Sequence, residues 1–106
     1  SVSTATGAID VTADGTLTAT SVISSCTDAD ANDISLTAVG ATSDISVVVV
    51  NAGAAGDVTL VAGDGVIDSD NTDGNVLTAD ELSVTATNAT DDAANVIDLD
   101  PSLIHV

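Results

Sequence analysis

The residues best suited to chemistry are the oxygen ligands of residues 69–74, Ser-Asp-Asn-Thr-Asp-Gly, which Asp80 follows six residues later. Their spacing is close to a calcium loop, in which oxygen ligands alternate, a glycine permits a sharp turn and a later carboxylate completes the shell. A serine stands at the first position, and strand-like residues follow where a helix would be expected. The predicted ligands are Ser69, Asn71, Asp73 and Asp80. The other interpretation is an acidic corner whose Asp and Asn side chains make turns.

A second acidic group consists of Asp33, Asp57 and Glu81, which are separated by 24 residues at each step. In stacked parallel strands these side chains would lie on neighbouring strands, about 4.8 Å apart. Directly opposed like charges destabilise a sheet unless a cation lies between them or solvent screens them. Both an ordered cation and screened repulsion fit the sequence.

The remaining side chains that could take part in catalysis do not form a recognisable catalytic motif in the sequence. Cys26 is the only cysteine, so it either links chains or fills a small buried site. His105 has no second histidine and no cysteine partner for a zinc site. There is no Gly-x-Ser-x-Gly motif, and paired carboxylates would lack the aromatic and basic groups that carbohydrate-cleaving sites use. We expect a protein that is not an enzyme and has no certain cofactor, with calcium as the one candidate.

The charge balance limits the partners. The 106 residues include 17 Asp and Glu, no Lys or Arg and no aromatic residue, giving a formal net charge of −17. Nucleic acids and anionic membrane surfaces are therefore excluded as expected partners, whereas cations are favoured. No apolar run reaches the roughly 18 residues of a membrane span. The chain begins without methionine or a basic leader, which suggests a processed product or an excised segment.

A repeated strand must position these residues. Residues 8–13 (Ala-Ile-Asp-Val-Thr-Ala) return in similar form as residues 33–38, 57–62 and 81–86, at steps of 25, 24 and 24. A short strand recurring at such an interval is typical of a unit that buries its apolar face only by stacking on its copies. The sequence predicts one all-β domain, a parallel β-solenoid (β-helix) of about four 24–25-residue rungs. The predicted rungs are residues 7–31, 32–56, 57–80 and 81–106.

Alternation within the repeated strand predicts which side chains point inward. The inward columns are Ile9/Ile34/Val58/Leu82, Val11/Leu36/Leu60/Val84 and Ala13/Ala38/Ala62/Ala86, and the outward columns are Ala8/Asp33/Asp57/Glu81, Asp10/Ser35/Thr59/Ser83 and Thr12/Thr37/Val61/Thr85. Further apolar runs predict two or three strands per rung. Between them, Gly and Asx clusters such as residues 51–56 and 63–65 are expected to supply the positive φ of sharp corners. The four consecutive valines at 47–50 cannot all point inward along one strand, so this strand should either pack against another layer or expose about two valines to a neighbour.

An antiparallel β-sandwich is the alternative fold, because about nine short strands would also suit it. The absence of a large core residue such as Trp or Tyr counts against it.

Residues 7–13, 53–65 and 75–86 resemble repeat units of very large bacterial surface proteins, the filamentous-haemagglutinin-like exoproteins and the giant "β strand repeat" proteins. The resemblance covers most of residues 7–100. It implies a right-handed parallel β-helix, secretion to the bacterial cell surface and a role as adhesin, fibre or matrix component.

The sequence therefore predicts an extracellular structural module that stacks end to end into a filament or adhesin stalk. Its expected partners are copies of itself or flanking repeats of a longer chain, because strand edges at the first and last rungs favour assembly. A calcium-dependent binding or adhesion module is the alternative function.

Overall fold

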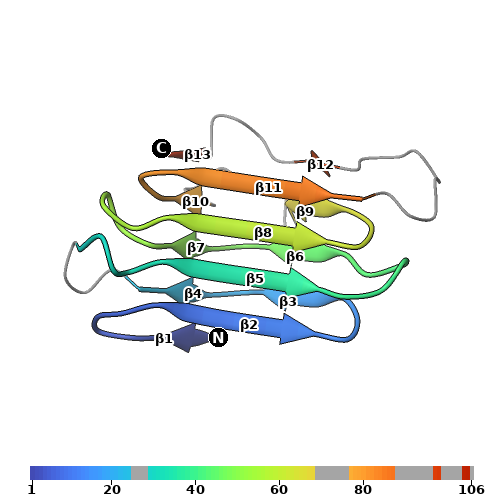
Figure 1. Ribbon diagram of the computed structural model, residues 1–106, viewed down its shortest axis with the longest axis horizontal. Helices are drawn as coiled ribbons and strands as arrows, with labels where there is room; N and C mark the ends of the chain where they lie inside the picture. The colour runs from blue at the N-terminus through green and yellow to red at the C-terminus, as the bar shows by residue number, and fades with distance from the viewer. Residues whose placement is uncertain (25–28, 69–76, 88–96, 99–103, 106) are drawn as a thin grey trace.

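The computed structural model describes residues 1–24, 29–68, 77–87, 97–98 and 104–105 of the chain (Figure 1). Every regular element in these ranges is a β-strand, so they contain no helix that could cross a membrane. The strands are β1 (Val2–Ser3), β2 (Ile9–Ala13), β3 (Leu17–Ala19), β4 (Val22–Ile23), β5 (Ile34–Ala38), β6 (Ile45–Val47), β7 (Val50–Asn51), β8 (Val58–Ala62), β9 (Val66–Asp68), β10 (Leu77–Thr78), β11 (Leu82–Ala86), β12 (Ile97–Asp98) and β13 (Ile104–His105).

These strands form three sheets in which strands three apart in the chain are neighbours. The first sheet has the order β2-β5-β8-β11, the second β3-β6-β9-β12 and the third β1-β4-β7-β10-β13. Each set of three strands from β2 onward, such as β2 to β4, contributes one strand to each sheet, and we call each set a rung (Figure 1). The stacking of parallel strands in chain order is compatible with the predicted solenoid.

The predicted register of the repeated strand is confirmed. Ile9 pairs with Ile34, Ile34 with Val58, and Val58 with Leu82, and the following positions pair in the same way through Ala13, Ala38, Ala62 and Ala86. The antiparallel sandwich is wrong, because all the strand pairs of the described residues are parallel. Parallel pairing places equivalent residues of successive rungs side by side, which explains why the strand recurs at steps of 24 and 25 residues. Antiparallel pairing would not need such a constant step.

The core lies between the three sheets and consists of small aliphatic side chains. Each sheet contributes to one connected cluster, as Leu60 from β8, Ile45 from β6 and Val50 from β7 illustrate. All three are fully buried. The predicted inward columns are confirmed, since their members are buried or pack half-buried against this cluster. Thin layers of Val, Ile, Leu and Ala fit the narrow space between short strands better than aromatic rings would.

The four consecutive valines lie at a corner. β6 ends at Val47 and β7 begins at Val50, and both of these side chains are fully buried. Val48 and Val49, between the two strands, are half-buried. The four valines therefore do not form the single strand that the sequence suggested: two are buried in different sheets, and the chain changes sheet between them.

Two of the corner glycines are needed for space and not for positive φ. Positive φ occurs at Gly7, Gly40 and Gly53, which leaves Gly56 and Gly63 outside that conformation. A Cβ added at Gly56 would lie 2.6 Å from the Ala52 carbonyl oxygen, and one added at Gly63 would collide with the Gly40 carbonyl oxygen. The expectation of positive φ is thus confirmed for residues 51–56 by Gly53, whereas Gly56 and Gly63 are required because backbone from an adjoining segment occupies the place of a side chain.

Candidate functional site

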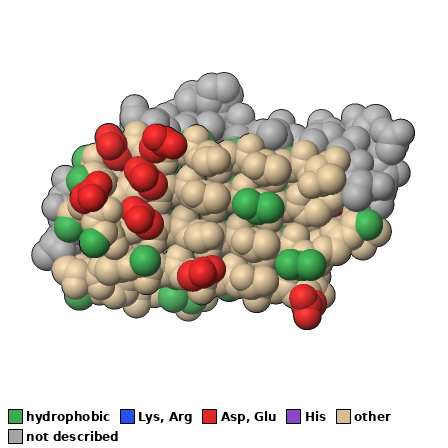
Figure 2. Space-filling model, viewed as in Figure 1, with side chains coloured by type: hydrophobic (Ala, Val, Ile, Leu, Met, Phe, Trp, Pro, Cys, Tyr) green, Lys and Arg blue, Asp and Glu red, His purple; other side chains and the backbone are tan. Residues whose placement is uncertain are grey.

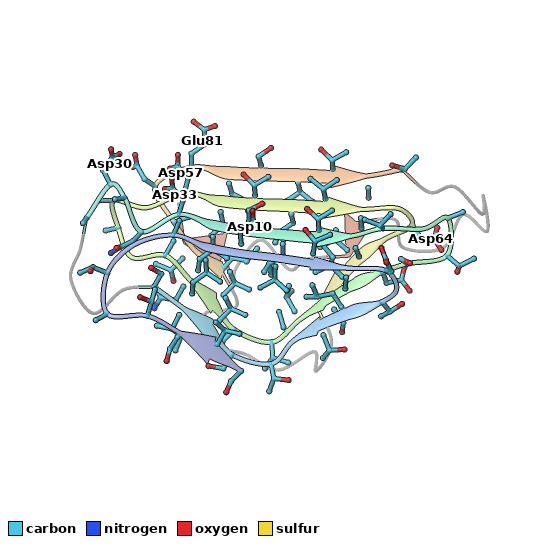
Figure 3. All side chains as sticks on the ribbon, turned by 60° about the horizontal axis from the view of Figure 1, so that its bottom comes forward. Asp10, Asp30, Asp33, Asp57, Asp64 and Glu81 are labelled. Carbon is cyan, nitrogen blue, oxygen red and sulfur yellow. The ribbon has the colours of Figure 1, made fainter. Side chains whose placement is uncertain are left out.

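The acidic column lies along one end of the first sheet. Asp33, Asp57 and Glu81 each stand one residue before a strand of that sheet, so the register that aligns β5, β8 and β11 also aligns the three carboxylates. Figure 2 shows acidic side chains gathered at the end of this face where the strands begin, and Figure 3 shows the three residues one above another. All three are exposed. We call this group the acidic column.

Backbone N–H groups bind the carboxylates of the acidic column. The Asp57 N–H donates to Oδ1 of Asp33, and the Glu81 N–H donates to Oδ1 of Asp57, each at 3.1 Å. The Asp33 and Asp57 carboxylates therefore each accept a hydrogen bond from the equivalent residue of the next rung. The sequence did not reveal these bonds, and the two alternatives that it left open, an ordered cation and screened repulsion, stay predictions. A charge-assisted hydrogen bond offsets part of the repulsion between successive carboxylates.

Residues just before the strands of the second sheet form the same kind of hydrogen bond between rungs. Asp44 stands directly before β6 and accepts at Oδ1 from the Gly65 N–H, at 3.0 Å. The Asp44 N–H in turn donates to Oγ1 of Thr16, the residue before β3, at 3.3 Å. Sequence reasoning missed this second ladder. The signal was present, because Asp44 precedes an apolar strand just as Asp33 and Asp57 do.

Buried polar side chains fix the corner from which the acidic column starts. Asn32 and Ser24 are completely buried. Oδ1 of Asn32 accepts from the Gly7 N–H at 2.9 Å, and Oγ of Ser24 donates to the Gly7 carbonyl oxygen at 2.6 Å. Both polar groups of the Gly7 backbone are thus satisfied, which offsets the cost of burying the two side chains. The interaction joins the first rung to the second immediately before Ala8 and Asp33.

Of the four predicted calcium ligands, the structure describes Asp80. Ser69, Asn71 and Asp73 lie outside the described residues. Asp80 is exposed at the corner before β11, where its N–H donates to the Gly56 carbonyl oxygen at 2.7 Å. Within the described ranges, no group of three or more His, Cys, Asp or Glu side chains is close enough to hold an ion. The calcium site stays a prediction.

The structure does not test the predictions for the cysteine and the histidine. Cys26 lies outside the described residues. His105 lies in β13, where its backbone pairs with Thr78 of β10. Sequence reasoning placed no strand there, because two residues are too few to show a periodic pattern.

The first sheet has two edge strands, β2 and β11. The Ile9 N–H donates to Asp33 O, and Ala13 O accepts from the Val39 N–H, so these β2 residues face β5. Residues alternate in a parallel ladder, hence the N–H and C=O of Asp10 and Thr12 point to the outer side. At the opposite edge, Glu81 O accepts from the Val58 N–H, and the Thr87 N–H donates to Ala62 O, so these groups face β8. The residues of β11 whose side chains face inward are Leu82, Val84 and Ala86. Their backbone N–H and C=O groups therefore point away from β8, toward the open edge of the sheet.

Comparison with known proteins supplies no relative. No protein-family model matches the chain, and no match was found among curated proteins or solved structures.

Proposed function

We propose that this chain is a segment of a three-sided parallel β-solenoid that serves as a structural module of a secreted bacterial surface fibre or adhesin stalk. Further rungs extend its sheets, supplied by copies of the chain or by flanking repeats. The chain performs no catalysis in this role, and the resemblance of its repeats to giant bacterial surface proteins supports the extracellular location.

The observation that carries the proposal is the incomplete burial of the core at both edges of the first sheet. In the middle strands the central inward residues, Leu36 and Leu60, are both 0% exposed. Their equivalents in the edge strands, Val11 and Val84, are only half-buried. A strand added beyond either edge would remove this apolar surface from water and pair the outward backbone groups, which favours extension.

The surface charge supports a role in a solvated extracellular assembly. With 17 acidic residues and no Lys or Arg, the chain repels anionic surfaces and resists nonspecific association. Lateral contact between such surfaces is costly, whereas addition at the strand edges uses backbone hydrogen bonds and apolar contact. The charge distribution therefore favours growth along the stacking direction.

Electron cryomicroscopy of the purified chain at increasing concentration tests the proposal. We expect filaments with an axial repeat near 4.8 Å, the spacing of neighbouring strands. Filaments without this repeat would contradict the stacked-strand account. A chain that stays monomeric at high concentration would contradict self-stacking and restrict the function to a stalk segment within a longer chain.

A further inference from the structure

We propose that two copies of this chain dock head to tail in a single register, with β2 of one copy adding to β11 of the other and Ile9 lying opposite Leu82. The inference rests on the proposed function and specifies its partner, a second copy, and the interface that joins them. It also assigns to β1 the role of a gate for this interface.

The register follows from the pairing already present within one copy. Ile9, Ile34, Val58 and Leu82 form one continuous column across the four strands of the first sheet. Continuing the same step places Ile9 of the incoming copy beside Leu82. The outward-pointing backbone groups then match, since the inward residues of β11 offer N–H and C=O groups to Ala8, Asp10 and Thr12 of β2. The new ladder repeats the geometry between β5 and β8.

The charges at this junction are compatible. Ala8 is the one uncharged member of the column that continues through Asp33, Asp57 and Glu81, and the proposed register sets it beside Glu81. No like charges are opposed there. The Glu81 carboxylate is then placed to accept the Ala8 N–H, as Asp33 and Asp57 accept the N–H of the next rung. Along the strand, Asp10 meets Ser83, the same pairing type that Asp10 makes with Ser35 within the copy.

The two apolar edges also cover each other. Leu82, Val84 and Ala86 at one edge, and Val11 and Ala13 at the other, pack only half-buried against the core. Their equivalents in β5 and β8 are at most 2% exposed. In the proposed register each half-buried side chain gains the neighbour that buries its equivalents. A one-residue shift would instead set inward residues beside outward ones, and a two-residue shift would leave one inward residue at each edge without its neighbour.

The third sheet imposes a condition on this docking. It contains five strands, because β1 pairs with β4 on the side away from β7, whereas β2 and β3 are edge strands of their own sheets (Figure 1). When β2 of the incoming copy sits on β11, β13 of the first copy arrives beside β4 of the incoming copy. β1 already occupies that place. One strand must leave for the two copies to join.

β1 is the strand suited to leave. Both of its residues are exposed, Val2 by 45%. It is held through the Val2 N–H, which donates to Ser21 O at 2.8 Å, and through the Thr4 N–H, which donates to Ile23 O at 3.0 Å. So short an edge strand releases at little cost. We infer that β1 limits self-stacking while it is paired and permits it when released.

Cysteine pairs placed across the junction test the register. In a Cys26→Ser background, Asp10→Cys and Ser83→Cys are made in separate chains and mixed under oxidising conditions. The two positions lie in opposite edge strands of one copy, and the proposed register brings them together between copies at about the 4.8 Å strand spacing, within disulfide range. Thr12→Cys with Thr85→Cys is a second in-register pair. Thr12→Cys with Ser83→Cys is the matched control, two residues out of register.

We expect cross-linked dimers from both in-register mixtures and few or none from the control or from any variant alone. Equal yields in all mixtures, or filaments that form without in-register cross-links, would overturn this inference while leaving the proposed function standing. Absence of both filaments and cross-links would count against self-stacking altogether.

The gate is tested with proline in β1. Val2→Pro removes the N–H that bonds Ser21 and should raise the yield of the Asp10–Ser83 cross-link severalfold. Ser3→Pro is the matched control, because alternation in the ladder turns the Ser3 N–H away from β4. It should leave the yield near that of the parent chain. An unchanged or lower yield for Val2→Pro, with circular dichroism showing an intact fold, would overturn the role assigned to β1.

Discussion

At the scale of single residues, the carboxylates before the strands act as hydrogen-bond acceptors. Asp33, Asp57 and Asp44 each accept an N–H from the equivalent residue of the next rung. An acidic side chain at this place contributes an acceptor to the ladder, and it also brings a charge close to its neighbours. The two effects oppose each other, and isosteric substitution separates them.

We predict that Asp57→Asn leaves stability unchanged or raises it by about 1 kcal/mol, because the amide oxygen still accepts the Glu81 N–H while the repulsion from two neighbouring carboxylates is removed. Asp57→Ala loses the acceptor as well and should be less stable than Asp57→Asn by about 1 kcal/mol. Urea denaturation followed by circular dichroism measures both.

Asp10 provides the control, because its carboxylate is exposed and takes no part in the rung-to-rung hydrogen bonds of Asp33, Asp57 and Asp44. Its Asn and Ala variants should differ less than those of Asp57. Equal stability of Asp57→Asn and Asp57→Ala would show that the bond to the Glu81 N–H contributes nothing.

At the scale of elements, corners join strands of only two to five residues, and close backbone packing defines them. Gly56 and Gly63 allow adjoining segments to approach where any Cβ would collide. Gly15, between β2 and β3, meets nothing within 4 Å and has no positive φ. The three glycines therefore offer a comparison of crowded and open corners in one chain.

We predict that Gly56→Ala and Gly63→Ala each lower the free energy of unfolding by about 1–3 kcal/mol or prevent folding, because the added Cβ meets rigid backbone oxygens. Gly15→Ala should be neutral or stabilising by up to about 1 kcal/mol, through reduced freedom of the unfolded chain. Thermal melting of the three variants side by side is the measurement. A Gly15→Ala loss as large as the other two would mean that space at the corner is not the cause.

At the scale of the whole molecule, the stacked rungs bring many acidic side chains close together, and no Lys or Arg balances their charge. The chain carries a formal net charge of −17, and the first sheet aligns three acidic residues at one end. Folding brings these charges closer than they are in the unfolded chain. Their mutual repulsion therefore opposes the compact state and any stack built from it.

We predict that the melting temperature rises by several degrees between about 0.01 M and about 1 M NaCl, as the Debye length falls from roughly 30 Å to roughly 3 Å. The Asp33→Asn/Asp57→Asn double variant is the matched control and should show a smaller rise, since two charges of the acidic column are gone. A flat or falling melting temperature in the parent chain would show that charge repulsion is not a significant cost.

The sequence alone determined the strands of the first sheet, their register and their inward side chains. Three near-identical steps align Ile9, Ile34, Val58 and Leu82, and alternation with period two then decides which face is apolar. Both signals are local and repeat four times, so a single chain is enough to read them. The calcium ligands proposed at residues 69–80 rest on spacing alone and stay a prediction.

The turns of the rungs and the partners of the acidic residues depend on contacts between distant parts of the chain. The three sheets, the burial of both Val47 and Val50 and the crowding at Gly63 depend on which segments meet at each corner. The Asp33 and Asp57 carboxylates accept N–H groups from the next rung, and no pattern along one strand reveals that contact. The sequence shows that these side chains are charged. Their hydrogen-bond donors are backbone N–H groups 24 residues away along the chain, which only the fold brings close.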